Sequence, residues 1–176
     1  MIDNVADYAK QGVPPESLAQ FFLKEYFAKK TIEFLLNPFQ MLTDIEIPFI
    51  FRPFNKYEGI YIPTADEEDI PVVGINLKRP IHRQRFTAAY ELCHHIKDTH
   101  AGCMCLSNSQ SITERYAEDF AAELLMSSIE FKYQVSLYEK DGYIDFEGVL
   151  KVADYFGVSF KSCINKIAYR LHKIKA

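Results

Sequence analysis

The sequence predicts an α+β fold in which a small three-stranded sheet, connected like a meander, packs on a helical bundle. Three observations lead to this prediction: helical spacing of apolar residues near the N-terminus, three short runs of β-branched and aromatic residues after it, and helical spacing again in the second half. This order of elements is typical of α+β domains. Because 176 residues suffice for one core and are few for two, we expect a single domain over residues 1–176.

The first helix is predicted from Pro14, where two prolines suit a first turn and apolar residues recur at helical spacing as far as Leu35. The pattern then changes to that of strands, with β-branched and aromatic residues in short runs. Turn-prone residues divide this part into three strands, over 45–54, 57–63 and 70–77.

Four helices are predicted after the sheet. One opens at Pro80 and ends before Gly102, and the next begins near Ser111. After a less regular stretch come two more helices, joined at Gly157. We expect these two to form a hairpin over 145–174 that completes the core.

The composition is that of an ordinary soluble globular protein. Apolar residues make up 48% of the chain and charged residues 25%, which excludes a disordered chain. A net charge of −4 argues against a protein that coats nucleic acid non-specifically. The apolar stretches are too short to span a bilayer, and no signal peptide is evident. The four cysteines are irregularly spaced, so we expect free thiols in a reducing cytosol.

One segment combines residues that can do chemistry, Tyr90-Glu91-Leu92-Cys93-His94. Residues four apart on a helix share a face, so Tyr90 and His94 are predicted to point the same way. Zinc hydrolases use this geometry as His-Glu-x-x-His, in which two imidazoles hold the metal and the glutamate takes a proton from the metal-bound water. A Glu-x-x-His pair is also a common contact on a helix surface, so the spacing alone leaves both interpretations open.

Three ordered motifs resemble those of the ImmA/IrrE family of zinc metallopeptidases. The stretch RQRFTAAYELCHHI resembles the signature in which Arg-x-Arg-Phe-Thr leads into the metal-binding helix, and IPVVGINLKRP before it matches the family's last strand. Further along, ERYAEDFAAELLM resembles the second motif, and LKVADYFGVSFKSCINKIAYRL resembles the closing helix pair. The resemblance covers roughly residues 15–174. It implies a zincin-like metallopeptidase core with zinc as cofactor.

The same resemblance assigns the general base to Glu91, the second zinc ligand to His94 and the glutamate ligand to Glu114. Glu114 has an alternative role, because Ser111-Ile112-Thr113-Glu114 fits a capping box in which the glutamate bonds back to the helix N-terminus. The residues alone favour the cap, and the resemblance favours the ligand.

Three positions depart from the family pattern. Tyr90 stands where the family has its first zinc-binding histidine, Glu118 stands where Asn or Asp is usual, and Ser127 replaces a proline. The last two are tolerable. The first is serious, because a phenol has a pKa near 10 and making it a phenolate ligand costs about 4 kcal/mol at pH 7 before the metal repays it.

Two interpretations of Tyr90 follow. Either the fold persists without tight zinc binding, or nearby imidazoles and thiolates build a different metal site. Against the second, the cysteines can simply sit in a loop. His95 is rotated about 100° from its neighbour and is expected to face solvent or a neighbouring helix. The candidate ligands of the alternative site are His94, His100, Cys103 and Cys105.

The C-terminal segment offers a rival interpretation as a helix-turn-helix. From residue 151 to 176, six Lys and Arg against one Asp give a local charge of +5. Side chains suited to reading bases are sparse, and only Lys161 and Asn165 are candidates. We favour a structural hairpin over a DNA reader, so direct binding of nucleic acid is not expected.

From these features we expect a cytoplasmic, ImmA/IrrE-like zinc metalloendopeptidase paired with a helix-turn-helix repressor of the Xre type. The resemblance implies that such a peptidase cleaves or binds the repressor in a phage, mobile-element or stress-response switch. The alternatives are an inactive binding module of the same fold and a DNA-binding regulator.

Overall fold

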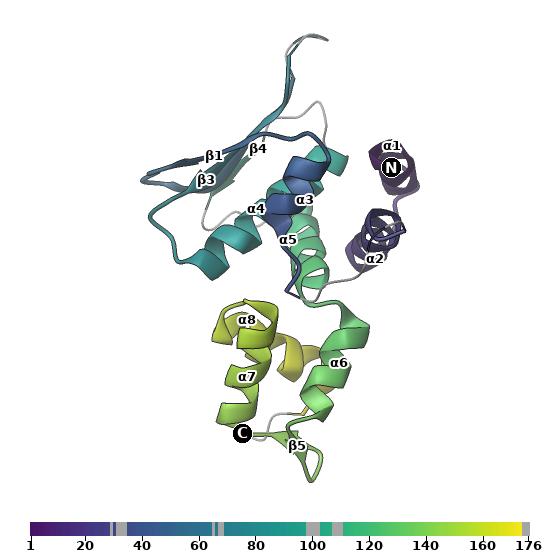
Figure 1. The fold of residues 1–176 in the computed structure, drawn as a ribbon, viewed down its shortest axis with the longest axis vertical. Helices are drawn as coiled ribbons and strands as arrows, with labels where there is room; N and C mark the ends of the chain where they lie inside the picture. The colour runs from purple at the N-terminus through teal and green to yellow at the C-terminus, as the bar shows by residue number, and fades with distance from the viewer. Residues whose placement is uncertain are drawn as a thin grey trace.

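The computed structural model describes residues 1–28, 30, 35–64, 66, 69–97, 103–106 (backbone only) and 111–173. It confirms the α+β class, with a mixed sheet and helices α1 to α5 in the upper part of Figure 1 and helices α6 to α8 below them. The helices are α1 Ile2–Ala9, α2 Pro15–Tyr26, α3 Pro38–Asp44, α4 Ile81–Lys97, α5 Ile112–Leu125, α6 Ser128–Ser136, α7 Phe146–Phe156, α8 Phe160–Lys166 and the π-helical turn η1 Ile167–Leu171. The strands are β1 Phe49–Arg52, β2 Tyr57–Ile62, β3 Val72–Asn76, β4 Cys103–Leu106, β5 Glu139–Lys140 and β6 Tyr143–Ile144.

The three predicted strands form, but their connection as a meander is wrong. The sheet order is β1-β3-β2-β4, with β1 parallel to β3 and β2 antiparallel to β3. The most apolar strand therefore takes an inner place. Four consecutive residues of β3, Val73 to Asn76, are buried, whereas Ile50, Phe51 and Arg52 of the edge strand β1 are exposed.

A fourth strand, β4, contains Cys103 and Cys105, for which the sequence offers a loop as one interpretation. The backbone of Cys103 and Cys105 lies in β4, which pairs antiparallel with β2. The loop interpretation of these two residues is thus wrong for the backbone, because pairing with a distant strand imposes an extended conformation that local turn signals do not reveal.

The long N-terminal helix predicted from Pro14 ends earlier than its apolar pattern suggests. In the described residues α2 stops at Tyr26, and a separate helix, α3, begins after Asn37, whose side chain accepts from the backbone of Phe39 and Gln40. Part of the predicted helix, residues 31–34, lies outside the described residues. Helix α1 was not predicted.

The predicted starts of α4, α5, α7 and α8 lie close to the observed ones, although α8 ends at Lys166 and continues as the π-helical turn η1. Pro80 precedes α4, and Ser111 caps α5 by accepting from the backbone N–H of Glu114. Gly157 ends α7 with φ +59°, the left-handed conformation that glycine adopts without strain. Helix α6 and the small β5–β6 hairpin fill the stretch that showed no regular pattern.

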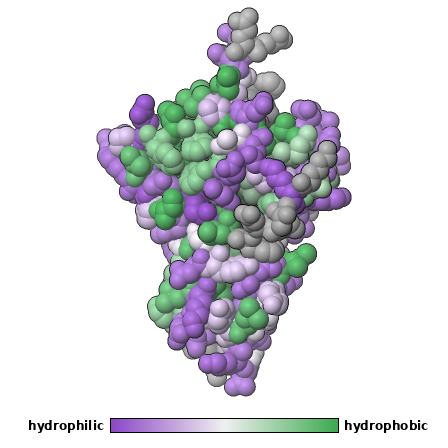
Figure 2. Space-filling view, in the orientation of Figure 1, coloured by the Kyte–Doolittle hydropathy of each residue, from purple (hydrophilic) through white to green (hydrophobic). Residues whose placement is uncertain are grey.

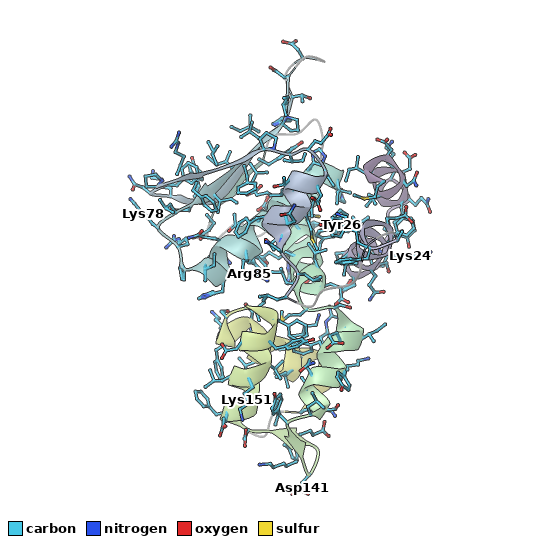
Figure 3. All side chains as sticks on the ribbon, in the orientation of Figure 1. Lys24, Tyr26, Lys78, Arg85, Asp141 and Lys151 are labelled. Atoms are coloured by element: carbon cyan, nitrogen blue, oxygen red, sulfur yellow. The ribbon has the colours of Figure 1, made fainter. Side chains whose placement is uncertain are left out.

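The buried apolar residues form two clusters. One lies among the sheet and α1 to α5, and the other among α6, α7, α8 and η1, with Val158 packed against both. Arg85 of α4 also joins the two parts, because its guanidinium donates to the backbone oxygens of Leu36, Phe156 and Gly157 (Figure 3). That residues 145–174 complete a single domain stays a prediction.

On the surface, apolar side chains gather over the sheet in the upper part of Figure 2. Ile50 and Phe51 of β1 and Ile62 of β2 are among the exposed apolar residues there. No helix among the described residues has both the length and the apolar character needed to cross a bilayer.

Candidate functional site

Two faces of helix α4 carry the side chains of the candidate site. Tyr90 and His94 lie on the face toward α5, where their rings meet edge to face with centroids 4.8 Å apart. Glu91 and His95 lie on the face toward strand β2. Residues four apart share a helix face, and the sequence correctly predicted this for Tyr90 and His94.

Glu91 is the most unusual side chain of this site. It is fully buried, and neither carboxylate oxygen has a hydrogen-bond partner among the described residues. Burial, and after it the nearby charge of Glu114, raises the pKa of Glu91 well above its usual value. A buried carboxyl group without a partner destabilises a fold, so such groups mark candidate functional sites.

A glycine in β2 makes room for that carboxyl group. A Cβ atom built on Gly59 would lie 2.3 Å from Cγ2 of Thr87 and 2.5 Å from Oε1 of Glu91. Any larger residue would displace one of them. Gly59 was not among the predicted site residues, although a glycine inside a strand pattern is a known signal of close approach by another group.

On the other face of α4, Tyr90 and His94 meet Glu114 of α5. The Tyr90 hydroxyl donates a hydrogen bond to Oε2 of Glu114. Nε2 of His94 lies 4.0 Å from Oε1 of the same carboxylate. Tyr90 and His94 are buried, and the Glu114 side chain is 13% exposed. The three side chains converge from two helices, as the resemblance implied.

Glu114 takes part in the helix cap through its backbone, and its side chain stays directed toward the candidate metal site. Its backbone N–H donates to Oγ of Ser111 at 3.2 Å, which forms one half of the capping box. Its carboxylate accepts from Tyr90. The carboxylate therefore lies where the resemblance needs a ligand.

These residues do not fit a three-ligand zinc site. They supply one imidazole and one carboxylate as ligands. The third group, the Tyr90 phenol, keeps its proton and donates it in a hydrogen bond to that carboxylate. Within the part of the chain that the structure describes, no three His, Cys, Asp or Glu side chains gather as a metal site. His100 and the side chains of Cys103 and Cys105 lie outside the described residues.

The chain matches one protein-family model over most of its length. The family model described as the IrrE N-terminal-like domain, a peptidase family, matches residues 43–168. The chain belongs to this family. The match spans the sheet, the two helices of the site and the C-terminal helices, and family membership makes the chain metallopeptidase-like. A search of curated proteins found no match.

Arg79, just before α4, and Arg83, in its first turn, hold the start of this helix in place. Arg83 pairs with the buried Glu58 of β2 at 3.2 Å, and Arg79 pairs with the same carboxylate at 2.7 Å. The β2–β4 register shifts between Tyr57 and Gly59, which leaves Glu58 at an irregularity of the strand. The two arginines thus fix the start of α4 against the strand that carries Gly59.

His95 contradicts the expectation that it faces solvent or a helix. Its Nδ1 lies 3.0 Å from the Tyr61 hydroxyl of β2, and burial lowers the pKa of His95 to about 4. The sheet packs across this face of α4, which the helical wheel alone does not show.

The two nucleic-acid candidates, Lys161 and Asn165, both lie on α8. Lys161 is exposed on the first turn of α8, and Asn165 lines a pocket between α8 and α5. Of the five Lys and Arg residues of the C-terminal segment that the structure describes, four form ion pairs with carboxylates. The pairs are Lys151–Glu147, Lys166–Glu123, Arg170–Glu16 and Lys173–Glu139.

Proposed function

We propose that this chain is a cytoplasmic regulator of the metallopeptidase type, which binds a segment of a helix-turn-helix repressor beside Tyr90, His94 and Glu114. In this proposal the wild-type protein holds the segment and does not hydrolyse it. The observation that carries the proposal is the hydrogen bond from the Tyr90 hydroxyl to Glu114. It occupies the carboxylate that a zinc ion would need.

The energetics of the phenol support binding without hydrolysis. Zinc binding through Tyr90 requires the phenol to ionise, at about 4 kcal/mol at pH 7, and also breaks the bond to Glu114. His94 and Glu114 alone give two conventional ligands, one fewer than a catalytic zinc site uses. Zinc is therefore expected to bind weakly, below one ion per chain in purified protein.

Zinc-dependent peptide hydrolysis is the second candidate, and Glu91 favours it. Its buried carboxyl group has no hydrogen-bond partner among the described residues and stands one helical turn before His94. A buried carboxyl group without a hydrogen-bond partner lowers the stability of the fold, so we expect Glu91 to have a role in catalysis. In this candidate Glu91 is the general base that the resemblance implies.

A role as a DNA-binding regulator is not proposed. The ion pairs of Lys151, Lys166, Arg170 and Lys173 leave little of the tail's charge available to phosphates. Lys161→Glu is accordingly expected to leave partner binding intact.

Co-expression with tagged repressors of the Xre type distinguishes the two candidates. The wild type and Glu91→Gln are both expected to capture a full-length repressor, and neither should shorten it. Capture is measured by affinity purification, and the length of the repressor by mass spectrometry. Glu147→Gln, an exposed carboxylate on α7, serves as the control. Cleavage by the wild type that chelator and Glu91→Gln both abolish would reject binding alone and establish hydrolysis.

A further inference from the structure

A groove lies beside the site, between α4, α5, α8 and η1. Its volume is about 290 Å³, and its lining includes Phe86 of α4, Glu118 and Ala122 of α5 and Tyr169 of η1. Phe86 precedes Tyr90 by four residues and Glu118 follows Glu114 by four, so each lies one turn away on the same helix face. The groove therefore begins about one helical turn from the Tyr90–Glu114 contact and lies on the side of the C-terminal helices.

Most of the charged side chains in the groove are neutralised within the protein. Lys166 pairs with Glu123 at 2.8 Å, and Arg170 pairs with Glu16. These pairs add no net charge to the lining. The third cation of the lining, Arg83, shares the Glu58 carboxylate with Arg79.

Two carboxylates that line the groove are not neutralised by an ion pair among the described residues. Glu118 and Asp119 are exposed on α5, and neither has a hydrogen bond or an ion pair among the described residues. Glu114, one turn before Glu118, adds negative charge toward the site, while the guanidinium groups of Arg83 and Arg115 also act on Glu118. Phe86, Ala122 and the buried Met126 supply apolar surface beside these carboxylates.

We propose that this groove binds a basic segment of the partner protein, with an apolar side chain on the floor and Lys or Arg beside Glu118 and Asp119. Charge complementarity carries the choice of occupant, since Glu118 and Asp119, the two charged lining groups without an ion pair among the described residues, are acidic and the whole chain has a net charge of −4. The same field repels nucleic-acid phosphates and acidic peptides.

The proposal rests on the proposed function for the identity of the partner. A helix-turn-helix repressor presents Lys and Arg on the surface that contacts DNA phosphates. A basic segment from such a surface fits a groove with two unpaired carboxylates. Binding there would also compete with DNA for the same side chains.

The direct test uses a fluorescent, end-capped peptide of alternating Lys, Leu and Arg, with a matched peptide that carries Glu in place of every basic residue. The full chain is expected to bind the basic peptide and not the acidic one, with affinity falling as salt is raised. Glu118→Gln with Asp119→Asn should weaken binding about fivefold. The control, Asp141→Asn with Asp154→Asn, removes two exposed charges outside the groove and should leave the affinity unchanged.

A second variant tests the floor of the groove. Ala122→Phe should fill the groove and weaken peptide binding, with circular dichroism confirming that the fold persists. Equal losses in the groove and control variants, or equal binding of the acidic peptide, would overturn the proposal. The same groove variants are also tested for capture of a co-expressed repressor. This experiment distinguishes failure of the groove proposal from failure of the proposed function. Capture that survives the groove changes rejects the groove and keeps the function. Peptide binding in the groove without capture of any repressor keeps the groove and rejects the function.

Discussion

Tyr90 links α4 to α5 at the point where the resemblance places a metal. Its hydroxyl bonds to Glu114, and its ring lies against His94 in a buried environment. A hydrogen bond to a charged group contributes about 1.5–3 kcal/mol to stability, so the two helices are joined without an ion. Tyr90, which is expected to weaken zinc binding, thus also links the two helices that a zinc ion would otherwise link.

Tyr90→His is expected to raise the zinc affinity by about tenfold or more, because it adds a neutral nitrogen ligand on the face that already carries His94. Glu114, freed from the phenol, then becomes available to the metal. Zinc affinity is measured by competition with a chromophoric chelator, and cleavage of a co-expressed repressor gives a second readout. The double variant Tyr90→His with Glu91→Gln should bind zinc and remain inactive.

Tyr90→Phe is the matched control, since it removes the hydroxyl and supplies no ligand. It should lower the stability by about 1–3 kcal/mol and leave zinc binding weak. If Tyr90→His binds zinc no better than the wild type or Tyr90→Phe, the assignment of His94 and Glu114 as ligands fails.

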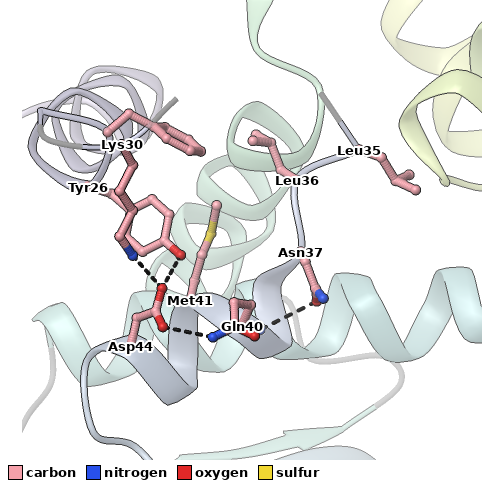
Figure 4. A pocket seen from close by; sticks show the side chains of 9 residues that line it. Tyr26, Lys30, Leu35, Leu36, Asn37, Gln40, Met41 and Asp44 are labelled. Carbon is pink, nitrogen blue, oxygen red and sulfur yellow. Dashed lines mark hydrogen bonds and ion pairs between the residues drawn. The ribbon is translucent and has the colours of Figure 1, made fainter. Parts of the chain in front are cut away.

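At the scale of elements, α2 and α3 are held together by one carboxylate. Asp44 at the end of α3 accepts from the Tyr26 hydroxyl, from Lys30 and from Gln40 (Figure 4). The Lys30 ammonium, followed by Tyr26 and Gln40, lowers the pKa of Asp44 to about 2 from its ordinary 3.8. α3 in turn packs against α4, so this tie supports the helix that carries the site.

Asp44→Asn is expected to lower stability at neutral pH and to lose this effect in acid. A carboxyl group with a depressed pKa in the folded state stabilises the fold above its unfolded pKa near 3.8, and the contribution disappears as the pH falls toward 2. Urea unfolding at a series of pH values measures the difference between wild type and variant. A difference that stays constant between pH 5 and pH 2 would contradict the ionic origin of the tie. Asp154→Asn on α7 is the control and should unfold like the wild type at pH 7.

At the scale of the whole molecule, Arg85 is the side chain that connects the upper and lower parts. It is 9% exposed and donates to Leu36, Phe156 and Gly157, of which the last two end α7. Buried ion pairing of Lys166 with Glu123 supports the same junction from α8. The floor of the groove lies at this junction, so its shape depends on both links.

Arg85→Met should destabilise the protein by about 2–4 kcal/mol, because it leaves buried backbone oxygens without their donor. Urea unfolding gives the free energy, and a second transition would show that the two clusters now unfold separately. Arg115→Met, an exposed position on α5, should change the free energy by less than about 0.5 kcal/mol. Equal effects of the two changes would reject the linking role.

The sequence by itself determined where α4, α5 and α7 begin and which face of α4 carries Tyr90 and His94. Prolines, the Ser111 cap and Gly157 act within one turn of the chain, and the spacing of Tyr90 and His94 sets their direction without help from distant residues. Only the tertiary structure decided the strand order, the direction of the Glu114 carboxylate and the approach of Glu91 to Gly59. Each of these depends on pairing or packing between segments far apart in the chain, where local propensities carry no information.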